Sequence, residues 1–194
     1  MRIQKLILGF ASMGLAIAAQ GITINYTFLE NGANVNLGSS STFTENGISL
    51  TAYASPGQEL YAKMGGGDEN GLGIASDSDH EINPKTYIQL QVPTSPISTL
   101  HMVFLGSVQP GESAQIYWSS TLGTLGSWIG AVTGDGSFDI SAYNITGYIG
   151  ITAGTGNVLI DGVTATADVP DSGTTVAMLG CALTALGLAR RKLV

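Results

Sequence analysis

Apolar and polar residues alternate in short runs through the middle of the chain. The first run places an apolar residue at every second position, at Ile22, Ile24, Tyr26 and Phe28. Successive side chains of a strand point to opposite faces of a sheet, so this period of two predicts a strand with one face in a core. The segment 47–54 repeats the pattern, with three residues predicted to point inward: Ile48, Leu50 and Ala52.

Further runs of this kind follow, each bounded by Gly, Pro, Asn or Ser: 59–64, 86–92, 99–105, 114–119, 127–132, 147–153 and 157–165. No segment between them places apolar residues at the helical spacing of three or four. About ten short strands at close spacing predict an all-β fold, an antiparallel β-sandwich of the jelly-roll type.

Two segments depart from the alternating pattern, and the first is 1–19. Arg2 and Lys5 precede an uncharged apolar run over 6–18, and the small residues Ala16 and Ala18 stand at the end of that run. This order is typical of a secretory signal peptide cut near Ala18 or Ala19. We therefore expect the region that follows to be exported.

The second segment is 168–194. It contains Val169, Pro170, Asp171, Ser172 and Gly173, then an uncharged apolar run over 174–189, and then three basic residues, Arg190, Arg191 and Lys192. Pro170 fixes its own φ and favours an extended Val169, so a processing enzyme could grip the motif as a strand-like peptide. As a single helix the apolar run would rise about 24 Å, which predicts a short transmembrane anchor helped by snorkelling arginines.

This segment resembles the PEP-CTERM class of bacterial sorting signals in its VPDSG variant. The resemblance covers Val169 to Lys192 and implies recognition by an exosortase-type membrane protease, with processing close to Val169–Gly173. It also implies a Gram-negative bacterium, transient anchoring in the inner membrane, and a final place on the cell surface or in the extracellular matrix of a biofilm. A sortase-type signal is the alternative, but it usually carries Leu at the first motif position and Thr at the fourth.

The chain therefore divides into a signal peptide (1–19), an extracellular β-domain (20–167) and a sorting segment (168–194). Between residue 20 and residue 168 the only basic residues are Lys63 and Lys85, against all but Asp171 of the 14 acids. A surface this acidic repels nucleic acid and attracts cations. The single cysteine, Cys181, lies in the apolar run, so the β-domain has no disulfide.

The densest group of acids predicts a candidate Ca²⁺ site. Carboxylates at Asp68, Asp77, Asp79 and Glu81 supply the hard oxygen ligands that Ca²⁺ takes, although the spacing is not that of an EF-hand. The alternative is a solvated acidic loop that protects a sheet edge and needs no cofactor. Zinc is not indicated, because His80 and His101 are about 20 residues apart with no further clustered ligand.

A second resemblance covers roughly 71–119. The sequence Gly71-Leu72-Gly73-Ile74, then Glu81-Ile82-Asn83 and an apolar strand over 87–92, is similar to the extracellular domain often found ahead of PEP-CTERM tails. In that domain a Gly-Leu-Gly-Val element precedes Glu-Ile-Asp. Asn83 stands here where the Asp is usual, which weakens any metal role that the resemblance implies.

Two aromatic residues are candidates for stacking on a sugar. On the strand 114–119, Trp118 is in phase with Ala114 and Ile116 and is predicted to lie in the core, which leaves Tyr117 on the outer face. Trp128 follows a Gly-rich turn. Amphipathic aromatics favour partly wet binding surfaces, although core packing is the alternative for both.

No catalytic constellation is visible. The sequence has no Gly-x-Ser-x-Gly motif, and neither histidine has a nearby serine with a third residue to orient it. We therefore expect a non-enzymatic surface or matrix protein with a structural or adhesive role. The alternatives are a carbohydrate-binding module that attaches cells to exopolysaccharide, and a secreted hydrolase.

Overall fold

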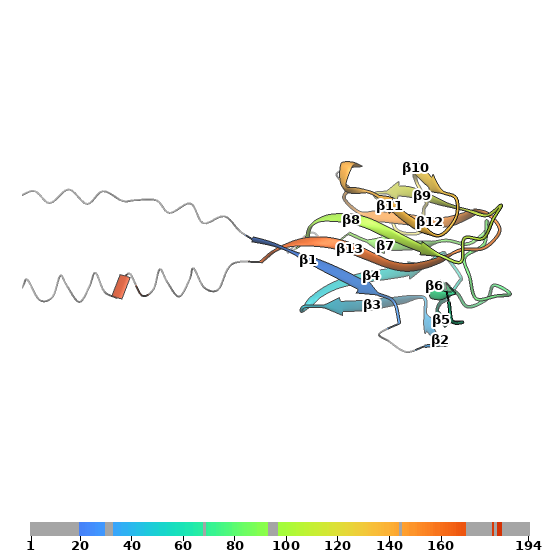
Figure 1. The fold of residues 1–194 in the computed structure, drawn as a ribbon, viewed down its shortest axis with the longest axis horizontal. Helices are drawn as coiled ribbons and strands as arrows, with labels where there is room; N and C mark the ends of the chain where they lie inside the picture. The colour runs from blue at the N-terminus through green and yellow to red at the C-terminus, as the bar shows by residue number, and fades with distance from the viewer. Residues whose placement is uncertain are drawn as a thin grey trace, which may run out of the picture. The chain divides into compact units, whose positions relative to one another are not determined.

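A computed structural model describes residues 20–29, 33–67, 69–92, 97–143 and 145–169, together with Gly180, Ala182 and Leu183. The chain separates into two compact units, one formed by Gly21–Val169 and one by Met1–Gln20 with Pro170–Val194. The first unit, called the β-unit below, contains every strand in full except the first residue of β1 (Figure 1). The predicted signal peptide, Pro170–Gly173 and the basic residues Arg190, Arg191 and Lys192 lie outside the described residues.

The β-unit consists of two antiparallel sheets. Sheet A contains, in spatial order, β11 (Gly136–Asp139), β8 (Ile97–Gly106), β13 (Leu159–Val169), β6 (Asn70–Ile74), β5 (Leu60–Met64) and β2 (Val35–Gly38), with β1 (Gln20–Thr27) also paired to β13. Sheet B contains β10 (Ser127–Val132), β9 (Ser113–Ser119), β12 (Tyr148–Thr155), β7 (Ile88–Gln91), β4 (Ile48–Ala54) and β3 (Ser40–Glu45). A single 3₁₀ turn, Ser141–Tyr143, is the only helical element described between Gly21 and Val169.

Both sheets contribute their inner faces to one hydrophobic core. The alternation seen in the sequence places Ile24 and Tyr26 of β1, and Leu50 of β4, in this core with less than 2% of their surface exposed. The rings of Phe28 and Phe43 meet edge to face at 4.8 Å, which joins the end of β1 to β3 in the other sheet. The Tyr26 hydroxyl also donates to the carbonyl of Ile48 at 3.3 Å. Core burial of this kind is the main stabilising term for a domain without disulfides.

The predicted all-β class is confirmed, and every predicted run contains a strand. Four strands are absent from the prediction: β2, β3, β6 and β11. β3 reads as polar because Phe43 is its only fully buried residue. β6 reads as a loop because it contains Gly71 and Gly73, which are required by close packing. A Cβ on Gly71 would lie 2.5 Å from the carbonyl oxygen of Ile160, and one on Gly73 would collide with the carbonyl oxygen of His80.

The end of the β-unit differs from the predicted boundary. Asp168 and Val169, assigned to the sorting segment from the sequence, belong to strand β13. Among the described residues no helix is long and apolar enough to cross a membrane. The predicted span at 174–189 contributes only Gly180, Ala182 and Leu183 to those residues.

Candidate functional site

The outer face of sheet B carries both predicted stacking residues. Tyr117 on β9 and Trp128 on β10 are direct cross-strand partners in the antiparallel pair. Ala114 and Ile116 alternate with Tyr117 and lie in the core, so Tyr117 points outward. The structure therefore brings together two aromatics that are distant in sequence, and Trp128 has 60% of its surface exposed.

Polar side chains lie around this aromatic pair. The Tyr117 hydroxyl donates to Oε1 of Gln115, two residues away on the same strand, at 2.6 Å. The paired strand β12 places Gly150 opposite Tyr117, and Leu125 packs over that glycine beside Tyr117. An exposed indole beside a half-buried phenol and an amide suits a ligand with apolar and hydroxyl faces. We call Gln115, Tyr117 and Trp128 the aromatic platform.

A loop over 120–126 crosses the outer face of sheet B next to the platform. It is fixed by Gln89 of β7, which is only 1% exposed. The Gln89 amide donates to the carbonyls of Thr121 (3.2 Å) and Thr124 (2.9 Å), and its carbonyl accepts the N–H of Gly123 at 2.6 Å. Leu125 packs over Gly150, since a Cβ on that glycine would lie 2.8 Å from Leu125 Cδ2. The loop thus shields the sheet where it carries no large side chain.

Tyr87, which precedes β7, adds a fourth bond to this loop. Its hydroxyl donates to the carbonyl of Gly123 at 2.5 Å, and burial raises the pKa of the Tyr87 phenol above its usual value. The role of Tyr87 and Gln89 was not predicted. Gln89 sits between Ile88 and Leu90 and reads as the solvent side of an alternating strand, so only the loop above it shows its function.

The predicted core position of Trp118 is only partly correct. Its strand phase is as expected, but the side chain is half-buried, and its indole N–H donates to the carbonyl of Thr146 at 2.6 Å. Trp118 lies near the end of β9, opposite Ser127 of β10. The core ends there, next to the loop that contains Thr146. A large ring with a hydrogen-bonding edge closes the core there.

The predicted calcium ligands have protein partners instead of facing one another. Asp77 accepts a hydrogen bond from the Thr86 hydroxyl at 2.7 Å, and Asp79 is 3.5 Å from the side-chain amide of Asn157. Asp68 lies outside the described residues. Among the residues that are described, no three His, Cys, Asp or Glu side chains form a metal-binding group. The Ca²⁺ site and its alternative, a solvated acidic loop, both stay predictions.

Glu81 is the most buried of these acids and forms an ion pair. Its Oε1 lies 2.5 Å from Lys63 Nζ and also accepts the Ser107 hydroxyl at 3.0 Å. Lys63 contacts Glu69 at 3.3 Å as well. Burial alone would lower the pKa of the Lys63 ammonium, but its hydrogen bonds and charge interactions with Glu81 and then Glu69 raise it above the usual value. Lys63 therefore compensates the charge of a buried carboxylate.

The segment with the second resemblance forms a packed corner around this ion pair. Gly73 allows β6 to contact the backbone at His80, and Ile82 pairs with Val158 through two backbone hydrogen bonds. Asn83 closes the next turn by accepting the N–H of Lys85 at 2.7 Å. In this corner Asn83 acts as a turn residue, the behaviour expected of a side chain that mimics a backbone acceptor.

Comparison with known proteins identifies the sorting segment. Residues 168–193 match the family model described as VPDSG-CTERM motif. No curated protein and no solved structure matches the chain. The motif indicates export to the cell envelope or surface and implies processing by exosortase-type machinery. The chain therefore carries a VPDSG-CTERM sorting domain of the PEP-CTERM type.

Proposed function

We propose that the β-unit is a non-enzymatic structural or adhesive component of the cell surface or biofilm matrix of a Gram-negative bacterium. The observation that carries the proposal is the position of the sorting match. It begins at residue 168, in the last two residues of β13. The last strand pair of β13 with β8 is Ala167 with Ile97, so processing within the motif would leave every described strand pair on the exported part.

We further infer that the β-unit is a jelly-roll sandwich. Eight strands support this architecture. In sheet A they run in the order β6, β13, β8, β11, and in sheet B in the order β7, β12, β9, β10. The chain crosses from one sheet to the other between all consecutive members except β9 and β10, as expected of two Greek keys wrapped together. The earlier strands β2 to β5 extend both sheets on one side.

The sorting half of the proposal is tested with the full chain in a host with and without an exosortase-type protease. With the protease, we expect surface protein whose C-terminus maps within Val169–Gly173. Pro170→Ala should leave the chain uncut, because the extended motif is lost. Pro110→Ala, in an exposed turn, is the matched control and should be processed normally. Surface material that still ends at Val194 would contradict the proposal.

A second candidate function is attachment to exopolysaccharide through the aromatic platform. The cross-strand pairing of Tyr117 with the exposed Trp128 favours it. In a pull-down with purified exopolysaccharide, Trp128→Ala should reduce retention, whereas Met64→Ala, an exposed apolar residue of sheet A, should not. Equal retention of both variants would exclude attachment through the aromatic platform, and the structural role would then be the only one of the two that remains.

A further inference from the structure

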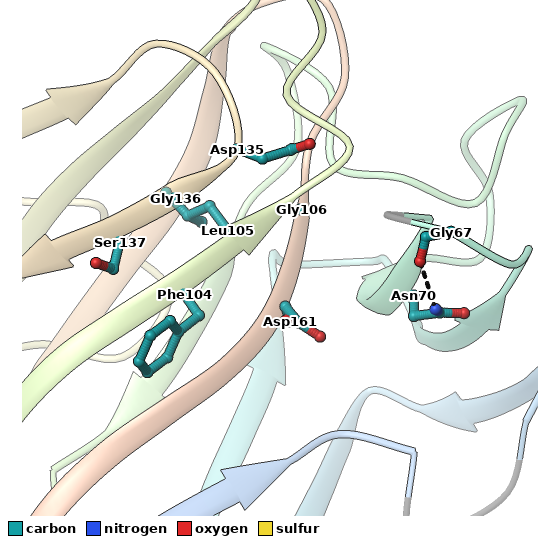
Figure 2. A pocket seen from close by; sticks show the side chains of 9 residues that line it. All are labelled: Gly67, Asn70, Phe104, Leu105, Gly106, Asp135, Gly136, Ser137 and Asp161. Atoms are coloured by element: carbon teal, nitrogen blue, oxygen red, sulfur yellow. Dashed lines mark hydrogen bonds between the residues drawn. The ribbon is translucent and has the colours of Figure 1, made fainter.

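The outer face of sheet A has a depression that the sequence did not indicate. It has a volume of about 430 Å³ and lies over β8, β11 and β13 beside Gly67 and Asn70 (Figure 2). Its lining includes Asn70, Phe104, Asp135, Ser137 and Asp161. A second depression of about 220 Å³ shares Phe104 and Asp161 and continues towards β1. Together they form one groove, called the sheet A groove below.

Phe104 is an apolar ring left open on a strand in the interior of the sheet. Its neighbours Val103 and Leu105 lie in the core, while Phe104 is 36% exposed. The residues paired with it are Ser137 on β11 and Gly162 on β13, both too small to cover a phenyl ring. Cross-strand neighbours normally cover such a ring, so this combination leaves it available to a ligand.

Two carboxylates line the groove together with Phe104. Asp135 lies in the turn before β11, and its Oδ1 accepts the N–H of Val108 at 2.7 Å, which fixes the side chain. Asp161 lies at an irregularity in the pairing of β13 with β8, between Ile160 and Gly162, and is exposed. Figure 2 shows Asp161 between Phe104 and Asn70. The Asn70 amide is itself held by the carbonyl of Gly67 at 2.9 Å.

The geometry limits what can bind. Strands β8 and β13 are paired on both sides, so the floor of the groove offers no free strand edge for an added peptide strand. A metal ion would need more ligands than two carboxylates, and the described residues contain no group of three. The groove can therefore recognise a ligand only through side chains, which offer one aromatic face and several hydrogen-bond acceptors. Its volume is typical of small-molecule sites.

We propose that the sheet A groove binds a saccharide that carries hydrogen-bond donors and no negative charge. A sugar ring lies with its C–H face on Phe104, and its hydroxyl or ammonium groups donate to Asp135 and Asp161. An ammonium group adds the attraction of opposite charges to its hydrogen bond with a carboxylate, whereas a hydroxyl does not, which favours an amino sugar over a neutral sugar. A uronic acid is repelled by the same carboxylates. This site is separate from the aromatic platform and would exist whichever role of the β-unit is correct.

Calorimetric titration of the full chain in detergent tests the proposal with three hexasaccharides, of glucosamine, glucose and galacturonic acid. We expect binding to fall in that order, with none for galacturonic acid. Phe104→Ala should weaken glucosamine binding about tenfold, and Phe104→Leu, which keeps an apolar side chain but removes the ring, should weaken it nearly as much. Asp161→Asn should weaken glucosamine binding more than glucose binding.

Tyr143→Ala is the matched control, since it removes an exposed ring that belongs to neither the sheet A groove nor the aromatic platform and should leave all three titrations unchanged. Melting curves establish that each variant is folded. Absence of binding by every hexamer, equal binding of galacturonic acid, or unchanged binding by both Phe104 variants would overturn the proposal. None of these results bears on processing of the sorting motif, which is measured separately.

Discussion

The side-chain amide of Gln89 forms three hydrogen bonds with the loop over 120–126, the shortest at 2.6 Å from the N–H of Gly123. This one side chain connects β7 to the connection between β9 and β10. The Tyr87 hydroxyl bonds to the carbonyl of the same glycine. The loop beside the aromatic platform is thus fixed from below by the sheet.

We predict that Gln89→Leu destabilises the β-unit. The substitution is close in size but leaves the N–H of Gly123 and the carbonyl of Thr124 without their partner, whereas the carbonyl of Thr121 keeps the Ser119 hydroxyl. Each of these groups that is left buried and unsatisfied costs about 1–3 kcal/mol. Urea unfolding should show a lower midpoint with an unchanged slope. Gln91→Leu is the control, because Gln91 is exposed and accepts only from the Tyr53 hydroxyl. Equal midpoints for the two variants would show that the loop does not depend on Gln89.

We predict that removing the Lys63 ammonium from the buried carboxylate of Glu81 strongly lowers the free energy of unfolding of the β-unit. Lys63→Met leaves the carboxylate of Glu81 without its cation, at side-chain exposures of 14% and 7% for the pair. Breaking one side of a buried pair costs about 3–5 kcal/mol. Lys63→Met combined with Glu81→Gln should recover part of the loss, and Lys85→Met, which is exposed, should change little. A Lys63→Met protein as stable as the Lys85→Met control would show that the pair contributes nothing.

The same pair predicts the direction of a pH effect. The folded-state pKa of Lys63 lies above the usual 10.5, so its contribution to stability is complete below that pH and is lost as pH rises through the folded-state value. The difference in melting temperature between wild type and Lys63→Met should therefore shrink only in strongly alkaline buffer. A difference that shrinks near neutral pH would assign the effect to another group.

For the acidic loop, we predict no specific response to calcium. Asp77 already accepts the Thr86 hydroxyl and Glu81 pairs with Lys63. Ca²⁺ and NaCl at matched ionic strength should raise the melting temperature equally, through screening of the acidic surface. A larger shift with Ca²⁺ that is lost in the variant Asp77→Asn with Asp79→Asn would instead establish the site, since a ligand specific to the folded state adds stability.

The sequence predicts the strands whose two faces differ in polarity, such as β1 and β4, because their alternation directly reflects burial. It does not predict β6, because the glycines of that strand are needed where other backbone segments pack closely against it and do not contribute to an alternating apolar pattern. The platform residues were found because Tyr117 alternates with core residues. Phe104 was missed because Met102 and Leu100 share its phase and are apolar too, so both phases of β8 resemble a core face. Its exposure depends on Gly162, which is distant in sequence.

Two glycines of the β-unit, Gly111 and Gly73, predict different costs on substitution. Gly111 lies in an exposed turn at φ +96°, and a Cβ there would meet nothing within 4 Å. Gly73 lies in β6, where a Cβ would collide with the carbonyl oxygen of His80 and approach the Cα of Glu81 at 3.0 Å. The first glycine is required by its own backbone conformation, and the second by its neighbours.

We predict that Gly111→Ala costs about 1–2 kcal/mol, the strain of a left-handed conformation with a side chain. Gly73→Ala should cost more, because either β6 or the His80 segment must move, and that movement would separate Glu81 from Lys63. The two effects are distinguished by combining each substitution with Lys63→Met. The costs of Gly111→Ala and Lys63→Met should add, since the two sites share no contact, whereas those of Gly73→Ala and Lys63→Met should fall short of their sum. Additive costs for Gly73→Ala as well would show that this glycine does not support the ion pair.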